Sequence, residues 1–131
     1  MNRVLICVST LLLASSILHA ADDAAGTFVG DYTNKAGKSG RYELTLTPGR
    51  DGNWTGEVLA VLDGRETRSP MTSLKVQGDT IQAAYDFEVK GHKASSRITG
   101  RRLGDALSGS FDTLYKGKVV DTGTWKTTRK K

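Results

Sequence analysis

Few residues of this chain have side chains that could do catalysis, and they are not arranged for it. His92 is the only histidine beyond a predicted N-terminal leader, and it follows Gly91 in a stretch typical of a hairpin tip. A catalytic base needs a nucleophile and an orienting acid close to it, and the sequence around His92 supplies neither. No Gly-x-Ser-x-Gly elbow presents any of the candidate serines, which are Ser95, Ser96, Ser108 and Ser110. We therefore predict a protein without catalytic residues, with an unrecognised hydrolase as the least favoured alternative.

Metal and cofactor sites are not expected either. The only cysteine, Cys7, lies in the predicted leader, and one histidine without cysteine cannot assemble a transition-metal cluster. The acids next to glycines are explained as turn formers better than as calcium ligands or a glycosidase pair. These acids are Asp51, Asp63, Asp79 and Asp105.

Aromatic residues interleaved with small ones are the strongest indication of a binding site. If every second residue of the predicted strands points inward, rings and small side chains meet in the interior. Small residues among rings can leave a pocket for one small apolar ligand in an eight-stranded barrel. They can equally interdigitate and fill the interior, and the general rule of close packing slightly favours this outcome. The candidate ligand residues are Tyr42, Trp54, Tyr85, Phe87 and Trp125, beside Ala60, Ala83, Ala94, Ser96, Gly100, Gly109 and Gly123.

A row of basic residues is the second candidate site. Lys93, Arg97 and Arg101 recur every four residues along one predicted strand, with Arg102 beyond them, and residues 90–131 contain 11 basic and 3 acidic residues. Such a face could bind an anionic envelope polymer such as lipopolysaccharide. An ordinary solvated strand face is the favoured interpretation, because Lys and Arg are common there. Nucleic acid is disfavoured, because exposed aromatic residues that could stack on bases are not evident apart from Tyr115.

The residues of segment 80–89 show the clearest structural pattern. Ile81, Ala83, Tyr85, Phe87 and Val89 alternate with mostly polar residues, which is the period of a half-buried β-strand. The same period predicts strands at 26–32, 41–47, 54–62, 93–103, 106–112 and 119–128, and short ones at 66–69 and around 74–76. A polar, basic tail begins at Thr127.

The turns between these strands connect each strand to the next. Asp63-Gly64 is a strong two-residue hairpin signal. Gly91-His92 is predicted to be the next such turn, which places Tyr85 opposite Ile98 and Asp86 opposite Arg97. Pro70 is expected to end the short strand before it, because proline cannot donate a ladder hydrogen bond. Eight or nine consecutive antiparallel strands must close or split to avoid long bare edges. We predict an all-β, up-and-down barrel of about eight strands, with a two-sheet sandwich as the alternative.

The N-terminus has the pattern of a secretory signal peptide. Arg3 precedes an apolar run to Leu18, and Ala20 suits the position before cleavage. A membrane anchor is the alternative, but the run is shorter than the ~20 residues that a span needs. We expect a signal peptide at 1–20, one barrel domain at 21–131, and a secreted or periplasmic protein that has no membrane span after cleavage.

Two short motifs resemble those of lipocalin-like and avidin-like barrels, the calycin type. Gly26-Thr27-Phe28 resembles their Gly-x-Trp opening, with Phe in place of Trp, and Gly123-Thr124-Trp125 followed by Arg129 resembles their closing strand. The segment 21–131 also resembles small barrel modules of bacterial secreted proteins. The resemblance implies a barrel and an exported protein, and no ligand residue carries over, because no position matches those families residue by residue.

These patterns lead to two functional hypotheses. The first is an exported, non-enzymatic barrel that binds a small apolar ligand or a protein partner. The second is a surface binder of polyanions that uses Lys93, Arg97, Arg101 and Arg102.

Overall fold

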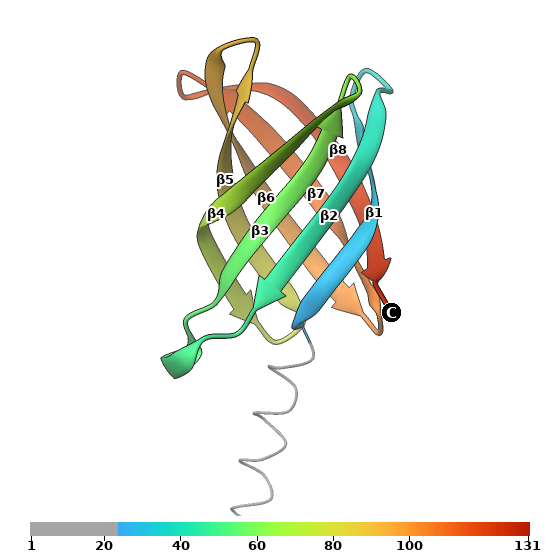
Figure 1. Ribbon diagram of the computed structural model, residues 1–131, viewed down its shortest axis with the longest axis vertical. Helices are drawn as coiled ribbons and strands as arrows, with labels where there is room; N and C mark the ends of the chain where they lie inside the picture. Colours follow the sequence, from blue (N-terminus) through green and yellow to red (C-terminus); the bar gives the residue numbers. More distant parts are fainter. Residues whose placement is uncertain (1–23) are drawn as a thin grey trace, which may run out of the picture.

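The chain folds into one closed barrel of antiparallel strands (Figure 1). The structure, a computed structural model, describes residues 24–131, so the predicted signal peptide at 1–20 lies outside the described residues. Each strand pairs with the next and β8 pairs with β1, which confirms the up-and-down barrel and excludes the sandwich. The strands are β1 (Gly26–Asn34), β2 (Ser39–Thr47), β3 (Thr55–Leu62), β4 (Arg65–Gln77), β5 (Thr80–Val89), β6 (His92–Leu103), β7 (Ala106–Tyr115) and β8 (Lys118–Arg129).

The alternation predicted for residues 80–89 is confirmed along β5. Ile81, Ala83 and Tyr85 are buried inside the barrel, whereas Gln82 and Asp86 are exposed. The inward residues predicted for β2 are buried in the same way. A period of two therefore sorted the side chains of these strands correctly between interior and solvent. Among the described residues, no helix is long and apolar enough to cross a membrane.

The segment around Pro70 differs from the prediction of two short strands. β4 continues through Pro70, which pairs with Glu57 of β3, and its register with β5 shifts between Met71 and Ser73. A bulge of this kind bends a strand and increases its twist. Pro70 therefore marks a bend within one long strand, which lets that strand follow the barrel wall.

The predicted turn at Gly91-His92 is wrong by one residue. Lys90 (φ 52°) and Gly91 (φ 81°) form the turn, and both lie in the left-handed region that two-residue hairpins of matching twist require. Moving a hairpin turn by one residue moves every partner by two, so each side chain keeps its face but changes its neighbour. Tyr85 consequently pairs with Ser96 instead of Ile98, and Asp86 pairs with Ser95 instead of Arg97.

The last two strands are longer than predicted. The expected loop at 113–117 is replaced by strand up to Tyr115, followed by a two-residue turn at Lys116 and Gly117. Thr127 does not begin a tail, because it is buried in β8 and its Oγ1 donates a hydrogen bond of 2.7 Å to the Leu107 carbonyl oxygen. Pairing of β8 with β1 extends as far as Arg129 and closes the barrel.

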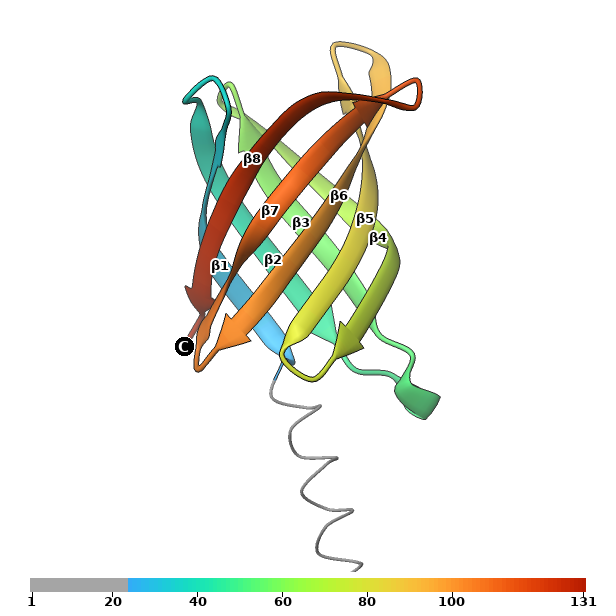
Figure 2. The same ribbon diagram turned by 180° about the vertical axis from the view of Figure 1, so that it is seen from behind.

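The two ends of the barrel differ. The turns β1–β2, β3–β4, β5–β6 and β7–β8 share one end, which we call the open end (upper end in Figures 1 and 2). The C-terminus, the start of β1 and the remaining turns lie at the other, the closed end. Side chains of the closed half pack to near-zero exposure; they include Phe28, Leu46, Ile81, Ile98, Leu107 and Trp125.

Glycines in this closed half accommodate a ring or a neighbouring backbone and do not leave empty space. A Cβ on Gly100 would lie 2.7 Å from the Trp125 ring, and one on Gly109 would lie 1.8 Å from the Thr99 carbonyl oxygen. The predicted small interior residues therefore serve two purposes. Some let the chain and the rings pack closely, and others, described next, line a cavity.

Candidate functional site

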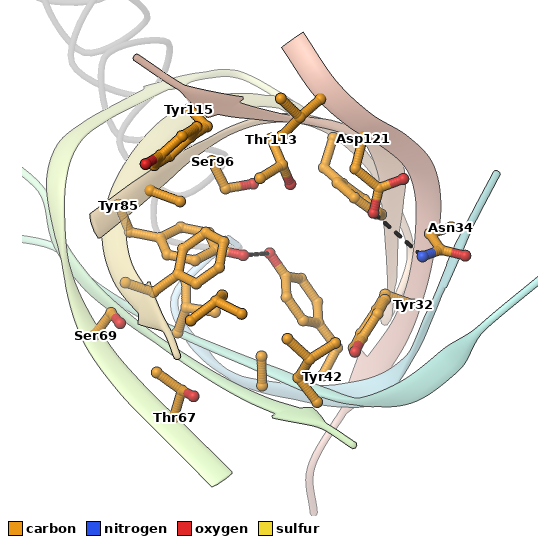
Figure 3. Close-up of a pocket in the computed structure, with 18 of the residues that line it drawn as sticks. Tyr32, Asn34, Tyr42, Thr67, Ser69, Tyr85, Ser96, Thr113, Tyr115 and Asp121 are labelled. Atoms are coloured by element: carbon orange, nitrogen blue, oxygen red, sulfur yellow. Dashed lines mark hydrogen bonds between the residues drawn. The ribbon is translucent and has the colours of Figure 1, made fainter. Parts of the chain in front are cut away.

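A cavity of about 470 Å³ occupies the half of the barrel toward the open end (Figure 3). Inward-facing residues of all eight strands line it, so the alternating pattern and the closure of the sheet build it together. The small side chains of Ala60 and Ala94 leave volume free inside the barrel. Much of the cavity surface is apolar, from Val58, Leu62, Phe87 and Phe111. The sequence slightly favoured a filled interior, and the structure corrects this: the barrel is filled only in its closed half.

Three of the five aromatic residues predicted to contact a ligand line this cavity. Tyr42, Tyr85 and Phe87 belong to its lining, whereas Trp54 and Trp125 do not. Trp125 lies in the packed half next to Tyr42, with ring centroids 5.9 Å apart, and its indole N–H donates to the Ser110 carbonyl oxygen. Trp54 precedes β3 and packs against the core from the closed end. Alternation could not separate the two groups, because it does not record position along the barrel axis.

Tyr42 and Tyr85, which we call the tyrosine pair, bridge the barrel. Their hydroxyl oxygens are 3.0 Å apart and share a hydrogen bond, although the residues are 43 positions apart in the chain (Figure 3). Both side chains are more than nine-tenths buried. Burial, followed by the neighbouring Tyr85, raises the pKa of Tyr42 well above 10. Burial also raises the pKa of Tyr85, and hydrogen bonding to Tyr42 partly offsets the rise. Both groups are therefore neutral hydroxyls at physiological pH.

Tyr32 forms a rigid wall beside this pair. Its hydroxyl donates a hydrogen bond of 2.8 Å to the Val61 carbonyl oxygen, so its proton is already used within the protein. Its ring packs edge-on against Tyr42 and Phe111, with centroids 5.8 and 6.1 Å apart. Edge-to-face contacts of this kind fix ring orientations. Tyr32 was not among the predicted ligand residues, although its inward position in β1 was recognised.

Ser96 is a polar residue of the cavity that was not among the predicted ligand residues. It faces Tyr85 across the β5–β6 ladder, is 1% exposed, and lines the cavity. The nearby Ser96 hydroxyl lowers the pKa of Tyr85 and offsets part of the rise caused by burial. Its Oγ nevertheless meets no partner at hydrogen-bond geometry among the described residues. The sequence marked Ser96 as a small inward residue and as an unsupported nucleophile. The corrected β5–β6 register is what brings it beside the tyrosine pair.

Polar side chains surround the mouth of the cavity. Asn34 Nδ2 donates a hydrogen bond of 3.2 Å to Asp121 Oδ2, which links β1 to β8 at the rim (Figure 3). His92 lies against Tyr115, with its Nδ1 3.4 Å from the Tyr115 hydroxyl. The only described histidine is thus paired with a phenol at the rim, away from the buried Ser96. Val120 is 59% exposed at the same mouth.

The basic residues predicted to bind anions do not form one group. Lys93 lies 3.7 Å from Asp86, and Arg97 lies 3.8 Å from Asp112 of β7. Arg102 has the opposite parity in β6, so its side chain is only 15% exposed and binds Asp79 at 2.7 Å. Arg101 is exposed on the outer face. Acids of neighbouring strands and of the β4–β5 turn thus balance three of the four charges, and anion binding by this row stays a prediction.

A second hollow, of about 410 Å³, lies outside the barrel over β2, β3 and β4. Its charged groups bind one another: Arg68 contacts Glu57 at 2.6 Å, and Arg41 contacts Glu43 at 3.0 Å. Within residues 24–131, no three His, Cys, Asp or Glu side chains cluster closely enough to hold a metal ion. The cavity inside the barrel is therefore the stronger candidate site.

Comparison of the chain with models of known protein families found no matching family, and comparison with curated proteins found no match.

Proposed function

We propose that this protein is an exported barrel that binds one small, mainly apolar ligand in the cavity at its open end and does no chemistry on it. The observation that carries the proposal is the cavity itself. Protein interiors are normally close-packed, and an unfilled volume of about 470 Å³ is within the ~300–1,000 Å³ typical of ligand pockets. Water in such a volume would lie against apolar walls, and an apolar molecule that displaced it would bind favourably through the hydrophobic effect.

The groups that line the cavity favour binding over catalysis. Among residues 24–131, Ser96 has no base beside it and the tyrosine pair is neutral, so none of the described side chains of the lining is an activated nucleophile. The packed closed half is consistent with one entrance, at the open end, where the ligand would enter between the four turns.

A lipocalin-like or avidin-like kinship is part of the proposal. It is supported by the eight-stranded up-and-down closure and by the two resembling motifs, which come together in space. The Arg129 guanidinium lies 4.8 Å from the centre of the Phe28 ring and closes the end opposite the cavity. Export is supported by the N-terminal sequence pattern.

A cavity-filling variant tests the proposed function. Residues 21–131 would be titrated with the neutral dye N-phenyl-1-naphthylamine, whose fluorescence rises in apolar surroundings. Ala94 lines the cavity, so Ala94→Leu should weaken dye binding at least tenfold by occupying part of its volume. Ala84→Leu adds the same side chain to the outer face of β5, where Ala84 faces Arg97 of β6, and should leave binding unchanged. No binding to the unmodified chain, or equal binding by both variants, would overturn the proposal.

A further inference from the structure

Three hydroxyl groups converge in the cavity with only one hydrogen bond among them. They belong to Tyr42 of β2, Tyr85 of β5 and Ser96 of β6, and we call them the hydroxyl trio (Figure 3). Tyr42 is 2% exposed, Tyr85 7% and Ser96 1%. The Tyr42–Tyr85 bond of 3.0 Å is the one that meets hydrogen-bond geometry. Within residues 24–131, Ser96 Oγ meets no partner at that geometry, although it is near enough to Tyr85 to lower the pKa of that hydroxyl.

The hydroxyl trio has more protons to donate than acceptors that receive them. Each hydroxyl has one proton to donate, and the bond within the tyrosine pair uses one of three. One tyrosine proton and the Ser96 proton are not used in a hydrogen bond of this geometry, so both can turn toward an acceptor placed between the two side chains. A buried hydroxyl without a partner costs roughly 1–3 kcal/mol, so proteins rarely keep one unless something else satisfies it.

The charge around the hydroxyl trio restricts what that acceptor can be. Lys90 and Asp121, the charged residues of the lining, belong to the β5–β6 turn and to β8 at the mouth, and His92 is also at the rim. No described cation of the lining lies beside the hydroxyl trio, so a carboxylate placed there would lose its hydration without gaining a counter-ion. A neutral oxygen with two lone pairs, which can accept from two donors at once, fits better.

We propose that the ligand places a neutral carbonyl oxygen, of a ketone or an ester, between Ser96 and the tyrosine pair, with its apolar body extending toward the open end. This inference rests on the proposed function, because it names the chemical class that the cavity would select. The apolar walls would supply most of the affinity, and the hydroxyl trio would supply the discrimination. A site built to donate hydrogen bonds rejects an analogue that cannot accept them.

Two ligands of nearly equal size test this discrimination. 2-Acetylnaphthalene and 2-ethylnaphthalene differ by a carbonyl in place of a methylene, and both can be measured by displacement of N-phenyl-1-naphthylamine. We expect the ketone to bind about tenfold more tightly to the unmodified chain, since two modest hydrogen bonds outweigh the cost of desolvating the carbonyl. 2-Naphthoate, the charged analogue, should bind more weakly than the ketone.

Ser96→Ala removes one donor and should reduce the preference for the ketone to about threefold or less, while binding of 2-ethylnaphthalene stays the same. Ser95→Ala is the matched control and should leave the preference unchanged, because Ser95 is the neighbouring serine of β6, pairs with the exposed Asp86 and does not line the cavity. Thermal unfolding would verify that both variants fold. In infrared spectra, the carbonyl stretch of the bound ketone should lie below its value in hexane, and Ser96→Ala should move it back toward that value.

The outcomes separate this inference from the proposed function. Equal affinity for the two naphthalenes, an undiminished tenfold ketone preference in Ser96→Ala, or tighter binding of 2-naphthoate would each overturn the carbonyl inference while leaving a ligand-binding cavity intact. Failure of all three compounds and of the dye to bind would overturn both.

Discussion

The hydrogen bond of the tyrosine pair makes a quantitative prediction about stability. Tyr42 and Tyr85 come from strands on different sides of the barrel, and their hydroxyls meet where both side chains are almost fully buried. Tyr42→Phe and Tyr85→Phe each remove one hydroxyl without changing the ring. Each single variant loses the hydrogen bond and leaves the remaining hydroxyl buried without this partner. The double variant removes both polar groups at once.

The expected magnitudes follow from that burial. Each single variant should lower the free energy of unfolding by about 1–3 kcal/mol, the cost of stranding a buried hydroxyl. Tyr42→Phe should be the milder, because the Tyr85 hydroxyl that it leaves faces Ser96 and can turn toward it. The double variant should cost less than the two single variants added together, with a coupling energy of about 1–2 kcal/mol, since replacing both partners can be nearly neutral.

Urea unfolding at pH 7, followed by tryptophan fluorescence, would measure all four proteins of this cycle. Trp125 is a suitable probe because its ring packs beside Tyr42 in the core. The slopes with urea should agree among the variants, so that midpoints report stability. Additive effects within about 0.5 kcal/mol would refute the reasoning, because independent sites add and hydrogen-bonded ones do not.

Three further predictions concern pH, packing and closure. The free energy of unfolding should fall as pH rises above about 10, because the unfolded chain releases tyrosine protons before the buried tyrosine pair does, and the double Phe variant should show a shallower fall in urea midpoint. Gly100→Ala should destabilise the barrel by about 1–3 kcal/mol, because the added Cβ would lie 2.7 Å from the Trp125 ring. The effect should be smaller in a Trp125→Phe background, and an equal effect there would contradict a clash with this ring. Arg129→Met keeps the alkyl stem but removes the guanidinium, which lies above Phe28, pairs with Asp105 and donates to the Ala25 carbonyl oxygen. The thermal midpoint should therefore drop by a few degrees, equivalent to about 1 kcal/mol, and an unchanged midpoint would show that these contacts do not help to close the barrel.

Much of the fold could be predicted because the sequence alternates almost without interruption. Periodicity identified the inward faces of β2 and β5, and Asp63-Gly64 forms the predicted turn, with both residues in the left-handed region. The errors occurred where local signals compete. Proline normally ends a strand, but Pro70 lies beside a bulge within one. Lys90 is not a typical residue for positive φ, so the sequence predicts Gly91 as the first residue of the turn, whereas it is the second.

The candidate site was only partly predictable, because the sequence does not show how far along the barrel axis a side chain lies. The sequence established which side chains face the interior, because that depends only on position within a strand. It did not establish that Trp125 fills one half while Tyr42 borders an open cavity in the other, nor that Ser96 meets Tyr85. Those facts depend on the exact turn residues, the bulge in β4 and the tilt of the strands, which together set how far along the barrel axis side chains from distant strands meet. The alternation in the sequence determined a closed sheet with a hidden interior, and only the tertiary structure decided where that interior is left open.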